Sequence, residues 1–536
     1  MTMKKASKKK IAIISSIVII SLILVSVLTV LTPRTYSHEL SSFSSYNEFY
    51  EFLKEQGIND QQYLYSFNTM PRMMEAADSS NNLVKTTSGS SDDLSFSETN
   101  IQVEGVDEPD SVKTDGTYVY ILSEQTIYIV QATPASSAQI VSTISLSNDV
   151  WYQSFFVNND RLIVFGESSP NYWYYSWEPI IEENSDLDNP VDSDNPVENS
   201  INNTLPEPGY WDVPQVVIHV YDLSTITDPL LLTTIELDGM FVNARMIDSK
   251  VYVVASEHTY YLYRFIDDVD YFKAPSITVN NITDDIQVDQ IYYVDEPDNV
   301  DSLTHILSLD ISSLDFTQKS FLIGNTQDIY MSMNHIYLVY TSYEYSFFLF
   351  DSPRVNRDQQ ITRIHKIKVE NDEITHIGSG EVPGRLVNQF SMDEHNTYFR
   401  IATTTGFIWD EENPSQNNVF ILDDQLSIVS SIRDIATGEE IYSARFMGDK
   451  AFLVTFKNVD PFFTLDLSDP YDPQVLGELK IPGYSDYLHP YDEHHIIGIG
   501  KDAIASNDPN FAWYQGVKLA LFNVSDFNNP TLVDTA

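Results

Sequence analysis

A tight turn followed by a short apolar strand recurs along most of this chain, and the repeat limits the folds that it can adopt. The first clear example begins at Asp115-Gly116, because glycine accepts a positive φ and an aspartate side chain can bond its own backbone. The turn leads into Thr117–Leu122, a run of β-branched and aromatic residues that is typical of a buried strand. Such a repeat predicts an all-β protein whose units bury their apolar faces against one another.

Two signals recur in step and set the expected number of repeats. One is an apolar strand after a turn, at Val119–Leu122, Leu162–Phe165, Val251–Val254, Ile336–Tyr340, Tyr398–Ile401, Ala451–Val454 and His495–Ile499. The other is a strand that ends in an Asp- or Ser-marked corner, at Ile127–Val130, Val220–Ser224, Ser308–Ser312, Ile364–Val369, Phe420–Asp424, Leu465–Pro470 and Phe522–Asp526. Seven of each signal predict a single β-propeller with seven blades, with six or eight blades as alternatives.

Several longer blocks carry a resemblance to a known family. They lie at residues 99–122, Ala244–Ile247 with Val251–Val254, Ser443–Asp449, Leu465–Pro470, Pro482–Pro490, Ile496–Gly500, and Gly516–Asp526 with Pro530. In these blocks the chain resembles the prokaryotic family of secreted proteins with a C-terminal β-propeller domain distantly related to WD-repeat propellers. The resemblance covers roughly residues 97–536 and implies a propeller outside the cytoplasm. It brings no catalytic motif with it.

The N-terminus has the features of a membrane anchor. An apolar run from Ile11 to Thr32 follows a lysine cluster, made of Lys4, Lys5, Lys8, Lys9 and Lys10. About 22 residues at about 1.5 Å each span a bilayer core, whereas the apolar part of a signal peptide has about 7–15 residues. We therefore expect residues 1–34 to form a cytoplasmic lysine cluster and one transmembrane helix, with a cleaved signal peptide as the alternative. The lysines stay in the cytoplasm, so the rest of the chain is exported from the cell.

Residues 35–98 connect this anchor to the propeller, which we expect over residues 99–536. A short amphipathic juxtamembrane helix is predicted before Gly57, because apolar side chains recur at three- and four-residue steps at Phe43, Tyr46, Phe49, Tyr50 and Leu53. Its apolar face either packs on the propeller or docks a partner. Residues 76–98, rich in Ser, Asn, Thr and Asp, predict a flexible tether. Within the propeller, uneven spacing predicts long insertions near 167–214 and 256–305, side by side on one rim.

Charge and cysteine content exclude several classes of function. The formal net charge is −48, from 30 basic and 78 acidic residues, and such a surface repels nucleic acid. The charge favours cations or a basic partner, with adaptation to a salty habitat as another explanation. The absence of cysteine excludes disulfides, thiolate metal ligands and a lipid-modified N-terminal cysteine. Attachment to the membrane therefore depends on the N-terminal helix.

The first insertion contains the candidate ligand-binding residues. Oxygen ligands for Ca²⁺, which takes about 6–8 of them, gather at Asp186, Asp188, Asp192 and Asp194. A solvated acidic loop without metal is the alternative interpretation. A stacking platform for a sugar or peptide is offered by Tyr172, Trp173, Tyr174 and Trp177, and burial of these rings between blades is the competing interpretation.

Two further groups of residues have both functional and structural interpretations. The opening block contains four acids, Asp107, Glu108, Asp110 and Asp115, which form either a cation or ligand site at the mouth of the central channel or a set of turn residues. Their turn-favouring positions favour the structural role. Asn-x-Ser/Thr triplets, which are glycosylation acceptors in hosts that modify exported proteins, begin at Asn202, Asn281 and Asn523.

No established catalytic motif is present, because the sequence lacks a Gly-x-Ser-x-Gly elbow, a His-Glu-x-x-His pair and a phosphate-cradling glycine loop. We therefore expect a membrane-anchored extracellular β-propeller that acts as a binding or protein-interaction module for a cell-surface protein or carbohydrate. An extracellular hydrolase acting on carbohydrate or peptide, and a cell-envelope structural protein, are the alternatives. Because a propeller must close its ring, we also expect Ile101–Val106 to join the sheet of the C-terminal blade.

Overall fold

The computed structural model describes residues 40–55, 101–168, 213–259, 262, 272–293, 300–346, 354–370, 373–410, 414–457, 460–481, 483–505 and 512–536. These residues form β-strands, the helix α2 (Tyr46–Glu55) and short 3₁₀ turns, so the predicted all-β class is confirmed. The expected membrane anchor lies outside the described residues. Within them, no helix has the length and apolar character needed to cross a bilayer.

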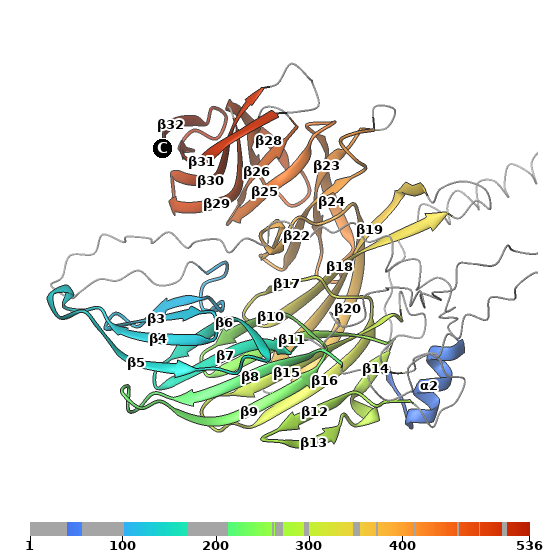
Figure 1. Ribbon diagram of the computed structural model, residues 1–536. Helices are drawn as coiled ribbons and strands as arrows, with labels where there is room; N and C mark the ends of the chain where they lie inside the picture. The colour runs from blue at the N-terminus through green and yellow to red at the C-terminus, as the bar shows by residue number, and fades with distance from the viewer. Residues whose placement is uncertain are drawn as a thin grey trace, which may run out of the picture. The chain divides into compact units, whose positions relative to one another are not determined.

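Within the described residues the strands form seven sheets, each built on four strands in chain order (Figure 1). The first sheet contains β2 (Val112–Thr114), β3 (Tyr118–Ser123), β4 (Thr126–Gln131) and β5 (Gln139–Ser145). The second contains β6 (Val150–Asn158), β7 (Arg161–Ser168), β8 (Gln215–Asp222) and β9 (Leu230–Asp238), with β12 (Ser276–Val279) and β13 (Ile282–Asp285) added at the β9 edge. The third contains β10 (Met240–Ile247), β11 (Lys250–His258), β15 (Ser302–Asp310) and β16 (Phe316–Ile323), with β14 (Ile291–Tyr293) and β1 (Ser41–Ser42) added at the β16 edge.

The other four sheets have four strands each. The fourth contains β17 (Asp328–Met331), β18 (His335–Ser346), β19 (Arg354–Glu370) and β20 (Glu373–Pro383). The fifth contains β21 (Met392–His395), β22 (Tyr398–Thr405), β23 (Gln416–Leu422) and β24 (Ile428–Ile435). The sixth contains β25 (Glu440–Met447), β26 (Lys450–Phe456), β27 (Asp460–Asp466) and β28 (Gln474–Ile481), and the seventh contains β29 (Tyr484–Asp492), β30 (His495–Ala505), β31 (Ala512–Asn523) and β32 (Thr531–Thr535).

The two recurrent sequence signals correspond to fixed positions in these sheets. The apolar strands after turns are the second strands, and the strands with a marked corner are the third strands. Second and third strands such as β7 and β8 are buried over most of their length, whereas the fourth strand β5 is mostly exposed. Neither of the two recurrent signals marks the first strands, several of which are only three or four residues long, as in β2, β17 and β21.

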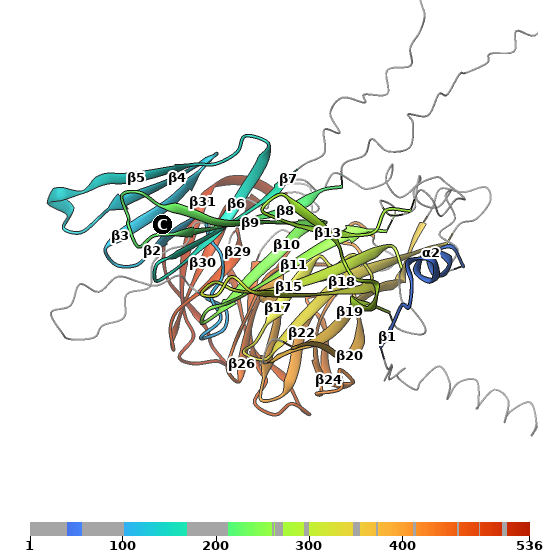
Figure 2. The same cartoon turned by 90° about the horizontal axis from the view of Figure 1, so that it is seen from below.

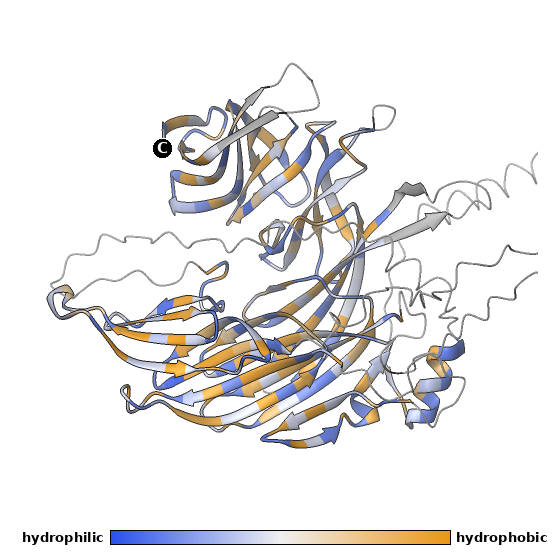
Figure 3. Ribbon diagram, viewed as in Figure 1, coloured by the Kyte–Doolittle hydropathy of each residue, from blue (hydrophilic) through white to orange (hydrophobic). Residues whose placement is uncertain are grey.

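The chain divides into two compact units, which we describe separately. The N-terminal unit comprises Glu39–Tyr340 and Ile367–His376, and the C-terminal unit contains Thr341–Lys366 and Ile377–Ala536. In both units the hydrophobic core lies between successive sheets. Phe156 and Ile163 of the second sheet, for example, share a cluster with Val251 and Leu307 of the third. Apolar and polar residues alternate along many strands (Figure 3), as expected when one face of a strand enters such a layer.

The outer edges of two sheets in the N-terminal unit are covered by chain that sequence analysis assigned elsewhere. Part of the insertion near 256–305 forms the β12–β13 hairpin beside β9, and β14 pairs with β16. The predicted amphipathic helix is confirmed as α2, which lies near β14 in Figure 1 and near β1 in Figure 2. Its Phe49 and Leu53 are fully buried in the core, and the Phe43 ring before it stacks on Tyr293 at 4.4 Å. The apolar face therefore packs within the chain.

The expected closure of the C-terminal blade by residues 101–106 is wrong. The seventh sheet, as far as it is described, contains four strands that all come from residues 484–535. Residues 101–111 instead pair with first strands of the N-terminal unit, through Asp107 with Met246 and Asp110 with Phe155. Because the last sheet already has its full set of strands, the opening block is left to contact other sheets.

Candidate functional site

Residues 101–111, which we call the strap, run across the first strands of successive sheets in the N-terminal unit. The backbone of Asp107 exchanges two hydrogen bonds with Met246 of β10, and Asp110 does the same with Phe155 of β6. Val106 of the strap is buried in the core cluster that contains Ile329 and Met331 of β17. The strap thus ties the second, third and fourth sheets together at their first strands.

Gly105 allows the strap to turn. Its φ is +82°, which side chains of L-residues rarely adopt, and an added Cβ would lie 3.1 Å from the Met333 sulfur. Val103 and Val106 bridge across this turn, and Val106 Nα–H donates to the Val103 carbonyl at 3.1 Å. The glycine is therefore needed both for the backbone conformation and for the close approach to the β17–β18 turn.

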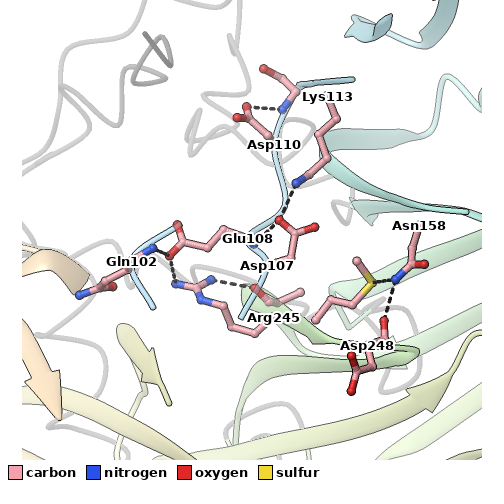
Figure 4. Close-up of polar contacts among 11 residues, drawn as sticks. Gln102, Asp107, Glu108, Asp110, Lys113, Asn158, Arg245 and Asp248 are labelled. Carbon is pink, nitrogen blue, oxygen red and sulfur yellow. Dashed lines mark hydrogen bonds and ion pairs between the residues drawn. The ribbon is translucent and has the colours of Figure 1, made fainter. Parts of the chain in front are cut away.

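Two acids of the strap, Asp107 and Glu108, lie near buried cations of the same unit (Figure 4). Asp107 accepts from Lys113 Nζ at 2.8 Å, and the Lys113 side chain is only 5% exposed. Burial raises the pKa of the Asp107 carboxyl, and the charge of Lys113 opposes that rise. Glu108 accepts from the Gln102 backbone N–H at 3.2 Å and lies 3.9 Å from Arg245 Nη2. These contacts support the structural interpretation of the opening block.

Asp115 likewise has a structural role. Its Oδ1 accepts from the backbone N–H groups of Thr117 and Tyr118 at 2.8 and 2.7 Å, and its Oδ2 accepts from the Tyr120 hydroxyl at 2.9 Å. These bonds hold the turn before β3 in place. Within the described part of the chain, no group of three or more histidine, aspartate or glutamate side chains is arranged to hold a metal ion.

The two long insertions leave the N-terminal unit from one end of neighbouring sheets, which we call the insertion end. The first begins after Ser168 of β7, which pairs with Gln215 of β8, and the second begins after His258 of β11, which pairs with Ser302 of β15. Glu167, next to the end of β7, accepts from the Phe241 backbone N–H at the start of β10 at 3.1 Å. This bond joins the two sheets directly beneath the insertions.

A buried polar network lies at the insertion end of the third sheet. Glu257 Oε2 is 3.1 Å from His305 Nε2, and His305 Nδ1 is 2.7 Å from the Ser320 hydroxyl. Burial raises the pKa of Glu257, which is 1% exposed. Its second oxygen has no hydrogen-bond partner among the described residues. The network holds three strands in register and is closed to solvent.

A second buried acid supports the neighbouring hairpin. Asp238 at the end of β9 accepts from Gln215 Nε2 at 2.9 Å and from both the backbone N–H and the hydroxyl of Ser276 at 2.8 Å. Lys273 Nζ lies 3.7 Å away. Sequence reasoning missed both buried acids. The partners of Asp238 and Glu257 are far away in the sequence. The only sequence feature that could have indicated these two acids is their position at the end of an apolar strand.

Most of the candidate ligand residues lie outside the described residues. This holds for Asp186, Asp188, Asp192, Asp194, Tyr172, Trp173, Tyr174, Trp177 and Asn202. Two glycosylation candidates are described. Asn281 is exposed in the turn between β12 and β13, whereas Asn523 is half-buried and its side-chain oxygen accepts from the Ser525 backbone N–H at 2.9 Å. Asn281 is thus the more accessible acceptor of the two.

A family model described as a beta propeller domain matches residues 96–536. The chain belongs to this family. The propeller part of the predicted resemblance is therefore confirmed, and the seven-sheet architecture of the described residues agrees with it.

Relatives with similar sequences are found in archaea. An uncharacterised protein of Archaeoglobus fulgidus is 28% identical over 507 residues, which cover 81% of this chain and 70% of the relative. An uncharacterised protein of Methanocaldococcus jannaschii is 29% identical over 512 residues, which cover 82% and 69%.

Two solved structures share a more distant likeness. A hypothetical selenium-binding protein from Sulfolobus tokodaii has a TM-score of 0.34 at 11% identity, covering 80% of this chain and 91% of that one. The C-terminal WD40 domain of Sif2 has a TM-score of 0.35 at 8% identity, covering 81% and 89%.

Proposed function

We propose that this protein is a seven-bladed β-propeller anchored in the cell membrane by its N-terminus, and that its insertion end binds a partner outside the cytoplasm. One observation carries the proposal. Two consecutive sheets send long insertions from the same end. That end rests on a rigid base, in which the carboxylates of Glu167, Asp238 and Glu257 accept hydrogen bonds from neighbouring strands. Loops held on a rigid scaffold are where binding functions concentrate.

The chemistry of the insertion end favours binding over hydrolysis. Glycoside hydrolysis of the usual kind needs two carboxyl groups that face the substrate, but two acids described at this end, Asp238 and Glu257, are 0% and 1% exposed. Both carboxyls are held by neighbours within the fold. A partner with basic or aromatic-stacking groups, such as a cell-surface protein or a carbohydrate, fits the acidic and aromatic composition of residues 167–214.

Loop replacement tests the binding site. Residues 171–210 are replaced by a short Gly-Ser linker, and proteins captured from the native cell envelope by the variant and the intact chain are compared quantitatively. We expect the variant to keep its melting temperature and lose its specific partners. The same linker in place of residues 347–353 is the control and should leave capture unchanged. Equal capture by both variants and the intact chain would exclude the insertion as the binding site.

Topology is tested on intact cells. External protease should digest the propeller, as followed with an antibody against the C-terminus, while a cytoplasmic marker survives. Full protection of the C-terminus would contradict export, and a mature N-terminus that begins after Pro33 would replace the anchor with a cleaved signal peptide.

Ca²⁺ at millimolar concentration, compared with Mg²⁺ at equal ionic strength, tests the proposed ligands Asp186, Asp188, Asp192 and Asp194, because a bound ion raises the melting temperature.

A further inference from the structure

Two first strands of the fold carry the same buried arginine. The sequences Asn243-Ala244-Arg245-Met246 and Ser443-Ala444-Arg445-Phe446 occupy equivalent positions in β10 and β25. Arg245 lies opposite Tyr252 and Arg445 opposite Phe452, and both strands have a bulge just before this segment. The side chains are 2% and 5% exposed, so both guanidinium groups are removed from water.

Arg245, in the N-terminal unit, has its partners within the chain. Its Nη1 donates to the Asn243 side-chain oxygen at 2.8 Å and to the Ala244 carbonyl at 2.7 Å. Its Nη2 lies 3.9 Å from the Glu108 carboxylate, which the strap places there (Figure 4). A buried cation needs such compensation, because an unpaired charge loses its hydration without replacement.

Arg445, in the C-terminal unit, lacks the equivalent partners. Ser443 stands in the place of Asn243, and its hydroxyl donates to the Ser485 carbonyl at 2.6 Å. Arg445 Nε and Nη1 are buried, and neither has a hydrogen-bond partner among the described residues. The guanidinium lies 5.3 Å from the centre of the Phe390 ring. That contact stabilises the face of the cation, but an aromatic ring face supplies no acceptor in the plane of the guanidinium, where Nε–H and Nη1–H point.

Aromatic and polar side chains of neighbouring elements lie next to Phe390, the ring that the Arg445 guanidinium faces. The Phe390 ring packs edge to face with Tyr487 at 5.3 Å, and the Tyr487 ring is 6.2 Å from His489. Next to Phe390, the hydroxyl of Ser391 is buried, and no hydrogen-bond partner for it lies within the described residues. These groups come from the 3₁₀ turn Gln389–Ser391, β25 and β29, and β25 contacts both of the other elements. They suit an anion.

We propose that Arg445 is a binding site for a carboxylate ligand, which supplies from outside the chain what Glu108 supplies to Arg245. A carboxylate matches the planar fork of a guanidinium, and a charge-assisted bond is worth more in a buried site than at the surface. The carboxylate belongs either to a small acid or to the acidic side chain of an extended peptide. This site is separate from the insertion end, and its test does not depend on the function proposed there.

The test uses the purified full chain and two carboxylate probes. One probe is succinate, and the other is a peptide with the sequence of Gln102–Pro109. Its control is the version in which Glu104, Asp107 and Glu108 are replaced by Gln, Asn and Gln and the C-terminus is amidated, so that no carboxylate remains. Isothermal titration at constant ionic strength should show binding of at least one carboxylate probe, and Arg445→Gln should weaken it by about 10-fold or more. Arg433→Gln, which changes an exposed arginine over the Phe420 ring, should leave binding unchanged.

The arms of the experiment separate the two ligand sources. Stronger binding of the peptide than of succinate assigns a peptide ligand, and the reverse assigns a small acid. If Arg445→Gln fails to fold, Arg445→Lys keeps the charge but loses the fork and should still weaken binding. In the unmodified chain, the probe should also shift one buried arginine Nε–H signal in NMR spectra. Absence of binding by both probes, or equal affinity in the Arg445 variants, would overturn the proposal.

Discussion

Buried charges in this protein are paired either with neighbours in sequence or with residues brought together by the fold. Lys113 and Asp107 are six positions apart and form an ion pair at 2.8 Å. Arg400 pairs with Asp393, seven positions away, and also lies over the Phe446 ring at 5.3 Å. Glu257 and His305, by contrast, are 48 positions apart. Local pairs form wherever the turn forms, whereas distant pairs depend on the register of the sheet.

Loss of Lys113 should leave the half-buried Asp107 carboxylate without its counter-ion. We expect Lys113→Met to lower the free energy of unfolding by about 1–3 kcal/mol, because Asp107 keeps its desolvation cost and loses the bond. Adding Asp107→Asn should restore part of the loss. Lys368→Met removes an exposed ion pair with Glu370 and is the matched control, with no measurable change expected. Urea denaturation gives the free energy of unfolding of the unmodified chain and of the three variants. Equal losses for Lys113→Met and Lys368→Met would contradict the role of Lys113 as a buried counter-ion.

His365 should make stability depend on pH. Burial lowers the pKa of His365 to about 3, and Arg363 contributes to the shift. In the unfolded chain the histidine binds a proton near pH 6.5, whereas in the folded protein it does so only near pH 3. The free energy of unfolding therefore has its full value above pH 6.5 and decreases as the pH falls from 6.5 toward 3. The loss is about 1.4 kcal/mol per pH unit. His365→Gln should lose less stability than the unmodified protein between pH 7 and 5, and parallel curves in denaturant titrations would contradict this assignment.

At the scale of elements, the fold combines strongly patterned strands with weakly patterned ones. The second and third strands of each sheet are apolar enough to be recognised, because sheets pack on both of their faces. The first strands β2, β17 and β21 and the added edge strands β12, β13 and β14 have only three or four residues, and strands this short depend on their neighbours for stability. The helix α2 is recognisable in the sequence by its single apolar face. The sequence left open whether that face packs on the propeller or docks a partner.

Truncation of α2 at its buried face should destabilise the N-terminal unit. Phe49 is fully buried, and its ring meets Phe272 edge to face at 5.6 Å. We expect Phe49→Ala to cost about 3–5 kcal/mol, as other buried phenylalanines do. Glu51→Ala, on the exposed face of the same helix, is the control and should be nearly neutral. Thermal denaturation compares the melting temperatures of Phe49→Ala and Glu51→Ala. Similar melting temperatures would show that the helix does not unfold cooperatively with the N-terminal unit.

At the scale of the molecule, stability depends on layers that join successive sheets. In the C-terminal unit, Phe462 of the sixth sheet stacks on Phe522 of the seventh, with ring centres 4.4 Å apart. Val454 and Ile496 belong to the same cluster. Because core clusters of the described residues draw on adjacent sheets, we expect sheets to unfold together with their neighbours.

Removal of the C-terminus tests this dependence. Deleting residues 518–536 removes Phe522 and exposes the apolar face of the sixth sheet, so the C-terminal unit should become sensitive to protease as a whole. Deleting only residues 531–536 removes β32, whose residues are all exposed, and should cause a small loss. Pulse proteolysis in urea measures the fraction of folded protein for both deletion variants. Near-native resistance of the longer deletion would contradict coupling between the last two sheets.

The sequence by itself was enough to determine the all-β class, the propeller repeat, two of the four strands in each sheet, helix α2 and the turn at Asp115. These features depend on residue periodicity and on turn chemistry, which act over a few residues. The tertiary structure alone decided that the strap pairs with β6 and β10 and that Glu257 meets His305. It also decided that Arg245 lies near the Glu108 carboxylate, whereas Nε and Nη1 of Arg445 have no acceptor among the described residues. Those outcomes depend on which distant strands become neighbours and in what register, and no local pattern encodes that choice.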